Sequence, residues 1–290
     1  MTGLDYSSDD VRSFDGTDIA ARQFTGGTGT PVLLCNAVGA NLTSWKLVLE
    51  RLVDSRPALA WDYRGLLDSA PPASPRIDPG AHAEDAIAVL DHFGVEHAHV
   101  AAWSTGSRVG IEIAHRYPER IEALALVCGG YGFSLPGLAA RGEWPALFVL
   151  AASAVKHFGT AVDGVLRAIT SRPELGALIR HSGFVGATAD TAALVDLVKG
   201  MASCDGKALL ATYEAVVGDS ALKLLREIHT PTLAIAGERD PFTPGAVYNE
   251  MRQRMPNLVI ESYEGATHFL PLEQPARLAE DLDGFFAGAR

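Results

Sequence analysis

The sequence predicts an α/β fold, with a mostly parallel central sheet flanked by helices and an inserted helical segment. Three observations predict it. Short, continuous apolar runs recur along the chain, amphipathic segments of helical period lie between them, and from about Tyr131 to Leu225 the strand pattern is absent. Continuous apolar strands are typical of a sheet covered on both faces by helices. Alternating strands and helices favour parallel strands joined by right-handed crossovers.

Two helices can be predicted between the strands, over Ala83–Phe93 and Ser107–Tyr117, where apolar residues recur on one helical stripe. Gly94 and Pro118 directly follow these segments, at positions where helices commonly end. Each apolar run is short enough to be a buried strand. The predicted strands are Val32–Cys35, Ala58–Trp61, His99–Trp103, Ala123–Cys128, Thr232–Ala236 and Leu258–Ser262.

The middle of the chain is predicted to be a helical cap. We expect an α/β core of residues 1–130 and 226–290 and a cap of residues 131–225. Ordinary crossover helices are the alternative, but a single crossover rarely needs a segment of this length. Aromatic residues are scattered through the predicted cap, among them Trp144 and Phe148. Each is more typical of a core, but together they indicate a pocket for an apolar group.

Composition and charge argue against several classes of function. The chain has 290 residues, of which 48% are hydrophobic and 20% charged, as is typical of a globular protein. Its formal net charge of -11 argues against nucleic-acid binding, because binding to phosphates depends on Lys and Arg. It also argues against a polybasic membrane anchor. The longest apolar stretch is too short to span a bilayer, so we expect no membrane insertion.

The cysteines and the start of the chain bear on its compartment. Cys35 and Cys128 end apolar runs, and we interpret them as buried thiols rather than disulfide partners. The first ten residues, MTGLDYSSDD, are acidic and lack the apolar region of a signal peptide. We therefore expect a cytoplasmic location. The oligomeric state stays open, with a homodimer as one alternative.

Ser104 is the centre of the predicted site. A predicted strand runs directly into it, and a predicted helix begins just beyond it. A nucleophilic serine on such a strained turn needs small residues two positions before and two positions after it. Ala102 and Gly106 meet that need, although Ala102 departs from the usual glycine. A lone serine is more often structural, but its position between strand and helix favours a nucleophile.

A serine hydroxyl needs an adjacent base to become nucleophilic. We predict that His268, in the loop after the last strand, is that base. Asp240 follows the strand that ends at Ala236 and is predicted to orient the histidine, with Glu238 as the nearest substitute. The chain order Ser, Asp, His is the one expected for a nucleophile elbow on an α/β sheet.

Four short sequence motifs occur together in the same chain, in an order that indicates a known family. They are Leu33 to Gly39, Asp62-Tyr63-Arg64-Gly65, the Ser104 turn, and Ala236 to Asp240 followed by Thr267-His268. With these motifs the sequence resembles the α/β-hydrolase superfamily over nearly its whole length. The resemblance implies an α/β-hydrolase fold and a triad of Ser104, Asp240 and His268. It also implies an oxyanion hole made by the backbone N–H groups of Thr105 and Val38.

The sequence departs from the family pattern at two more places. Asn36-Ala37 stands where many members have His-Gly, and this version is similar to the branch that contains 3-oxoadipate enol-lactonases. Leu67 replaces a glycine that is common two residues after Gly65. Neither change removes a reacting group, so both bear on the substrate rather than on the mechanism.

Three residues are predicted to bind substrate: Asn36, Trp103 and Trp144. Core packing is an equal alternative for Trp103. No cofactor is expected, because side chains and backbone N–H groups supply every group that the reaction needs. The cluster of His92, His97 and His99 lacks the carboxylates or cysteines that would complete a ligand set, so we expect no metal site.

The predicted function is hydrolysis of a carboxylic ester or lactone of a small to medium apolar substrate through an acyl-enzyme on Ser104. Carbon–carbon bond hydrolysis and cofactor-free perhydrolysis are alternatives that use the same triad. A ligand-binding protein without turnover is the alternative from another class. The expected partner is a small-molecule ester or lactone.

Overall fold

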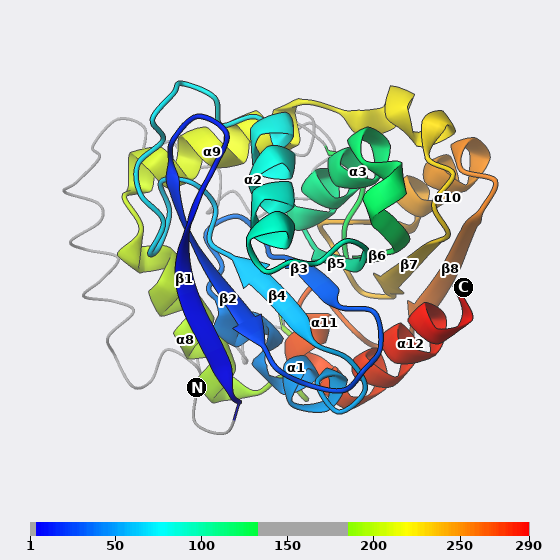
Figure 1. Cartoon of the computed structure of the whole chain (residues 1–290). Helices are drawn as coiled ribbons and strands as arrows, with labels where there is room; N and C mark the ends of the chain where they lie inside the picture. The colour runs from blue at the N-terminus through cyan, green and yellow to red at the C-terminus, as the bar shows by residue number, and fades with distance from the viewer. Residues whose placement is uncertain (1–3, 133–184, 290) are drawn as a thin grey trace.

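The computed structural model describes residues 4–132 and 185–289. Its centre is an eight-stranded sheet in the order β1-β2-β4-β3-β5-β6-β7-β8 (Figure 1). Strands from β4 to β8 pair in parallel with their neighbours, whereas β2 is antiparallel to both β1 and β4. The prediction of a mostly parallel sheet is confirmed. The strands are β1 Tyr6–Arg12, β2 Asp18–Phe24, β3 Val32–Cys35, β4 Ala58–Trp61, β5 Ala98–Trp103, β6 Ile121–Val127, β7 Thr232–Gly237 and β8 Leu258–Tyr263.

All six predicted strands are present, but the N-terminal hairpin β1-β2 was not predicted. Strand β1 leaves every side chain except Val11 exposed, so its sequence contains no apolar run. No apolar alternation marks it either, because every residue from Tyr6 to Asp10 is exposed, although the Tyr6 ring packs on that of Phe24. A strand at the edge of a sheet that is solvated on both faces carries no hydrophobic signal.

Helices cover both faces of the sheet, as the continuous apolar strands predicted. The helices α2, α3 and α10 pack on one face with one cluster of buried side chains, and α1, α11 and α12 pack on the other with a second cluster (Figure 1). No helix in residues 4–132 and 185–289 is long and apolar enough to cross a membrane. These helices are α1 Lys46–Leu52, α2 Pro79–His92, α3 Gly106–Arg116, α10 Gly245–Arg254, α11 Leu270–Glu273 and α12 Pro275–Gly288.

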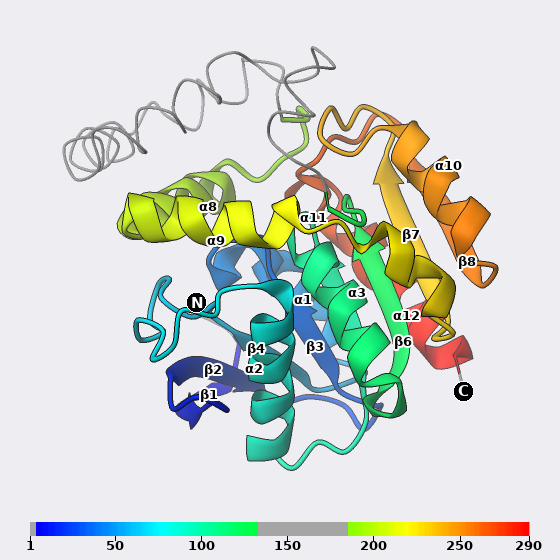
Figure 2. The same cartoon turned by 90° about the horizontal axis from the view of Figure 1, so that it is seen from above.

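The described part of the predicted cap is helical. It contains α8 Thr191–Ser203, α9 Gly206–Gly218 and a 3₁₀ helix over Ala221–Glu227, and residues 128–132 and 185–231 include no strand. Helices α8 and α9 lie outside the sheet, over the loop that follows β3 (Figure 2). There the Asn41 side chain donates to the carbonyl of Asp196 at 3.0 Å. The cap boundaries 131–225 stay a prediction, and Trp144 and Phe148 lie outside the described residues.

A buried guanidinium fixes the loop after β4. Arg64 is fully buried and donates to both carboxylate oxygens of Asp85, at 2.8 and 2.6 Å, and to Asp15 at 2.8 Å. These bonds join the β1-β2 turn, the loop and α2. Leu67, at the position where the family commonly has glycine, adopts a positive φ of 54°. A glycine would adopt this left-handed conformation without strain, whereas the leucine is kept in it by the surrounding structure.

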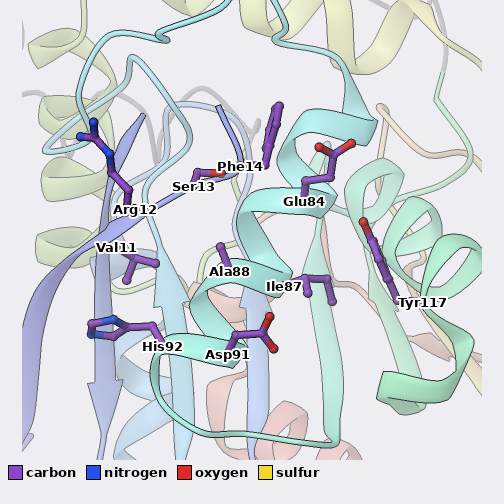
Figure 3. Close-up of a pocket in the computed structure, with 10 residues that line it drawn as sticks. All are labelled: Val11, Arg12, Ser13, Phe14, Glu84, Ile87, Ala88, Asp91, His92 and Tyr117. Atoms are coloured by element: carbon purple, nitrogen blue, oxygen red, sulfur yellow. The ribbon is translucent and has the colours of Figure 1, made fainter. Parts of the chain in front are cut away.

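A surface pocket of about 630 Å³ lies between the N-terminal hairpin and α2 (Figure 3). Tyr117 lines it from the end of α3 that is far from Ser104. Its acidic and basic groups already pair with one another or with neighbours, as Arg12 does with Asp18 and Asp91 with Arg120. We assign it no function. Its lining residues are Val11, Arg12, Ser13, Phe14, Glu84, Ile87, Ala88, Asp91, His92 and Tyr117.

His82 makes the fold sensitive to acid. Its ring is fully buried beside Tyr63, and burial together with the charge of Arg64 lowers the pKa of His82 to about 3. Because the unfolded chain binds a proton near pH 6.5 and the folded chain does not, stability falls as the pH drops from 6.5 towards 3. The slope from this one group is about 1.4 kcal/mol per pH unit at most.

We therefore expect His82→Leu to flatten the dependence of the unfolding free energy on pH between 4 and 6 by about one proton. Denaturant unfolding at a series of pH values measures this slope. His97→Leu is the control, because it removes a histidine whose side chain is half exposed instead of buried. Equal slopes for the wild type and His82→Leu would contradict the assignment.

Candidate active site

Ser104 occupies a tight turn between β5 and α3. Strand β5 ends at Trp103, helix α3 begins at Gly106, and Ser104 between them has a positive φ of 56°. This left-handed conformation costs a non-glycine residue on the order of 1–3 kcal/mol. The backbone N–H of Ser104 donates to the carbonyl of Val127 at 2.9 Å, which anchors the turn to β6. The predicted strand–serine–helix turn is present.

The turn is crowded on both sides. A Cβ at Gly106 would lie 2.3 Å from the carbonyl oxygen of Cys35 and 2.5 Å from that of Asn36, so only glycine fits there. Ala102 fits because the opposite position on α3 is Gly110, where an added Cβ would lie 3.0 Å from the Ala102 methyl group. The departure from the usual glycine at residue 102 is thus accommodated by a glycine at 110.

The structure brings Ser104, His268 and Asp240 together. The Ser104 hydroxyl lies 2.7 Å from His268 Nε2, and His268 Nδ1 lies 2.9 Å from Asp240 Oδ2. The Asp240 side chain is fully buried and that of His268 nearly so, whereas Ser104 is partly exposed. A hydrogen-bonded chain from carboxylate to imidazole to hydroxyl is the arrangement in which a histidine can remove a serine proton.

Short local contacts hold Asp240 in place. Its second oxygen, Oδ1, accepts hydrogen bonds from the N–H groups of Phe242 at 2.8 Å and Thr243 at 3.1 Å. This turn aims Oδ2 at the imidazole. Glu238, the alternative carboxylate, is exposed and instead accepts from the N–H of Gly265 at 2.8 Å.

The Trp103 side chain is buried and contacts the backbone of His268 instead of facing solvent. Its indole N–H donates to the backbone carbonyl of His268 at 3.0 Å, and its side chain is buried in the core. The residue before Ser104 thus supports the histidine directly. Of the two interpretations that the sequence left open for Trp103, the geometry favours core packing.

The predicted oxyanion donors have different partners. The N–H of Val38 donates to the side-chain oxygen of Thr105 at 2.8 Å. The backbone N–H of Thr105 has no acceptor among the described residues. The two residues are in contact, but the Thr105 hydroxyl accepts the hydrogen bond of one of the two predicted donors, and the oxyanion hole stays a prediction. A carbonyl oxygen that used both donors would have to replace this hydroxyl.

Asn36 uses its amide to fold its own loop. The amide nitrogen donates to the carbonyls of Ala40 and Asn41, both at 2.8 Å, and the amide oxygen accepts from Ala37 N–H and the Ser44 hydroxyl. This arrangement favours a role in shaping the loop that carries Val38. The substrate contacts predicted for Asn36 and Trp144 stay predictions.

Two features of the site were missed in the sequence. One is Glu273, a buried carboxylate that binds the residue before His268. Its signal was a single charged residue directly after the apolar run Phe269-Leu270-Pro271-Leu272. The other is Gly110, whose role depends on a contact between strand and helix. Among the described residues, no group of three His, Cys, Asp or Glu side chains is arranged to hold a metal ion.

Comparison with known proteins places the chain in a family. A family model described as alpha/beta hydrolase fold matches residues 30–275. The chain belongs to the α/β-hydrolase family. The match covers β3 to β8 and therefore includes Ser104, Asp240 and His268.

Curated relatives of this α/β-hydrolase have diverse activities. A 2-hydroxymuconate semialdehyde hydrolase of Pseudomonas sp. strain CF600 is 32% identical over 113 residues, 38% of this chain and 40% of that protein. A poly(3-hydroxyalkanoate) depolymerase of Ectopseudomonas oleovorans is 25% identical over 245 residues, 83% of this chain and 79% of that protein. Several relatives, the first of these included, are matched over less than half of their own length.

Solved structures share the fold at low identity. The enol-lactonase from Burkholderia xenovorans LB400 superimposes with a TM-score of 0.74 at 19% identity, covering 97% of this chain and 100% of that one. A thermophilic esterase from Thermogutta terrifontis gives 0.73 at 19% identity, covering 98% and 99%. At such identities the likeness concerns the fold alone.

The crowding at Gly106 leads to a stability test. We expect Gly106→Ala to destabilise the protein by more than about 2 kcal/mol, because the new methyl group would overlap two backbone carbonyls that have no room to move. Gly284→Ala is the matched control. Gly284 lies inside α12 with nothing within 4 Å of an added Cβ, so alanine there should stabilise by roughly 0.5–1 kcal/mol. Denaturant unfolding measures both changes, and a neutral Gly106→Ala would refute the packing argument.

Proposed function

We propose that this chain is a serine hydrolase that cleaves a carboxylic ester or lactone of a small to medium apolar substrate. The observation that carries the proposal is the hydrogen-bonded chain from Asp240 through His268 to Ser104, whose donor–acceptor distances are 2.9 and 2.7 Å. Membership of the α/β-hydrolase family supports it. The cap of residues 131–225 is part of the proposal, as the segment that shapes the pocket for the acyl or alicyclic group.

In the proposed mechanism, Ser104, His268 and Asp240 have different roles. His268 Nε2 takes the Ser104 proton while the serine oxygen bonds to the substrate carbonyl carbon, and Asp240 stabilises the imidazolium that forms. The protonated His268 then gives this proton to the leaving oxygen as its bond to carbon breaks, which leaves an acyl-enzyme. A water molecule, deprotonated by the same imidazole, attacks the acyl carbonyl, and Ser104 leaves with the proton. Every proton passes through His268, and no cofactor is consumed.

The developing oxyanion is assigned to the backbone N–H groups of Thr105 and Val38. Such preorganised donors commonly contribute about 3–4 kcal/mol each to the transition state. In the free protein the Val38 N–H donates to the Thr105 hydroxyl. The substrate carbonyl oxygen would take this acceptor position, so the hydroxyl must turn away when the tetrahedral intermediate forms.

A second candidate reaction is hydrolysis of a carbon–carbon bond next to a carbonyl group. One observation favours it: a relative whose substrate is 2-hydroxymuconate semialdehyde is 32% identical over 113 residues. The same three residues would serve both reactions. Parallel assays with p-nitrophenyl esters of increasing chain length, several lactones and a vinylogous 1,5-diketone separate the candidates by kcat/KM.

The nucleophile assignment is tested by Ser104→Ala. We expect this variant to lose at least about 10³-fold in kcat on a p-nitrophenyl ester, because the Ser104 hydroxyl is the one that hydrogen-bonds to His268 Nε2 among the residues that the structure describes. Ser107→Ala is the control. Its hydroxyl lies at the start of the same helix and donates to the carbonyl of Ala102 at 3.4 Å, so this variant should keep most of its activity. If Ser104→Ala retains the wild-type rate, the nucleophile has been assigned to the wrong residue.

The oxyanion assignment is tested by a crystal structure of the Ser104 phosphonyl adduct. We expect the phosphoryl oxygen within about 3.1 Å of both the Val38 and Thr105 backbone nitrogens. We also expect the Thr105 side chain in a different rotamer from the free protein. A hydroxyl that still accepts from Val38 in the adduct would mean that Val38 is not an oxyanion donor.

A further inference from the structure

Glu273 connects the loop that contains His268 to a second segment of the chain, at Gly186. It belongs to α11, is almost completely buried, and accepts hydrogen bonds from three donors. Its Oε2 accepts from the N–H of Thr267 at 2.7 Å. Its Oε1 accepts from the Thr267 hydroxyl at 2.5 Å and from the N–H of Gly186 at 2.7 Å. Among the described residues, no Lys, Arg or His side chain forms an ion pair with this carboxylate.

A buried carboxylate without a cation is costly unless donors satisfy its oxygens. Here both oxygens are satisfied, and two of the three bonds go to one residue, Thr267. The next residue in the chain is His268. The Glu273 carboxylate therefore fixes the backbone and the side chain of Thr267, directly before His268. Asp240 instead contacts the His268 ring itself, at Nδ1.

The third bond reaches a different part of the chain. Gly186 lies in the described segment that leads into α8, within the predicted cap, and the N–H of Asp190 donates to the carbonyl of Leu272 at 3.0 Å beside it. The approach at Gly186 is close. An added Cβ there would lie 2.8 Å from Glu273 Cδ and 3.0 Å from both of its oxygens. One carboxylate thus contacts both the histidine loop and the segment that leads into α8.

We propose that Glu273 is a positioning residue that fixes the position of His268 relative to Ser104. Through Glu273, the position of His268 also depends on the segment at Gly186. The proposal rests on the proposed function, because its consequence for turnover requires His268 to be the base. The hydrogen bond from Ser104 to His268 depends steeply on distance, and a misplacement of about 1 Å can cost a reaction 10²-fold. A substrate that displaces the Gly186 segment would shift the base through this carboxylate.

Glu273→Gln tests the positioning role. The glutamine keeps the size of the side chain but turns an amide N–H towards one of three groups that are themselves donors, so at least one bond is lost. We expect kcat on a p-nitrophenyl ester to fall about 10-fold or more, while KM changes less than about threefold, because the loss affects the base and not the pocket. Unchanged kcat in a folded Glu273→Gln protein would overturn the proposal.

Glu238→Gln is the matched control. Glu238 also accepts a hydrogen bond from the histidine loop, at Gly265 N–H, but it is exposed, and Gly265 lies three residues before His268 whereas Thr267 lies directly before it. This variant should keep kcat within about twofold of the wild type, since an exposed bond contributes little. A similar loss of kcat in both variants would assign the effect to the loop in general rather than to Glu273, against the proposal.

Gly186→Ala tests the coupling to the Gly186 segment and also serves if Glu273→Gln does not fold. It leaves the carboxylate and the histidine loop unchanged in sequence but pushes on the Glu273 side chain. We expect kcat to fall in the same direction as for Glu273→Gln. If kcat falls in Glu273→Gln but not in Gly186→Ala, the coupling is refuted.

A spectroscopic signal separates this inference from the proposed function. The proton between His268 Nδ1 and Asp240 should give a downfield ¹H resonance, which we expect to shift or disappear in Glu273→Gln and to persist in Glu238→Gln. This readout needs no turnover. If the wild type hydrolyses no ester, the proposed function fails while the resonance still reports on His268. If the resonance is identical in all three proteins, the positioning role fails while the function stands.

Discussion

The close approach of α3 to the end of β3 is the constraint on which the candidate site depends. Gly106 lies against the carbonyl oxygens of Cys35 and Asn36 so tightly that no side chain fits between them. This contact compresses the link between β5 and α3 to two residues and leaves Ser104 in a left-handed conformation. The strain is repaid by burial of α3 against the sheet. The same approach brings Thr105 within hydrogen-bond distance of Val38, so one packing contact shapes both the nucleophile and the oxyanion region.

A second close approach of two backbone segments positions His268. Gly237 ends β7, and a Cβ there would lie 2.4 Å from the carbonyl oxygen of Thr267. The absence of a side chain lets the loop after β8 pass over the end of β7, where Asp240 is held. Trp103, Asp240 and Glu273 then each fix a different part of the histidine and its neighbour. The histidine loop is thus held by residues at the end of β5, after β7 and in α11.

The grouping of Ser104, Asp240 and His268 could be predicted because each residue follows a parallel strand, and parallel strands place their carboxyl ends at one edge of the sheet. The strands before Ser104 and Asp240 are buried apolar runs, whereas β8, before His268, is a partly exposed edge strand. Strand β1 could not be predicted in this way, because its side chains face solvent. The hydrogen bond from Val38 N–H to the Thr105 hydroxyl and the hydrogen bonds of the Asn36 side-chain amide could not be predicted either. These hydrogen bonds depend on the rotamers of the side chains, which the hydrophobic periodicity of the sequence does not predict.

The central claim is that Ser104 becomes covalently acylated with His268 as its base. Mass spectrometry of the protein after reaction with a fluorophosphonate, followed by peptide mapping, tests this claim most directly. We expect one phosphonyl group for each chain on the peptide that contains Ser104, and at least about 10³-fold slower labelling in His268→Ala. Native protein that gains no mass, or a modification mapped to another residue, would contradict the account.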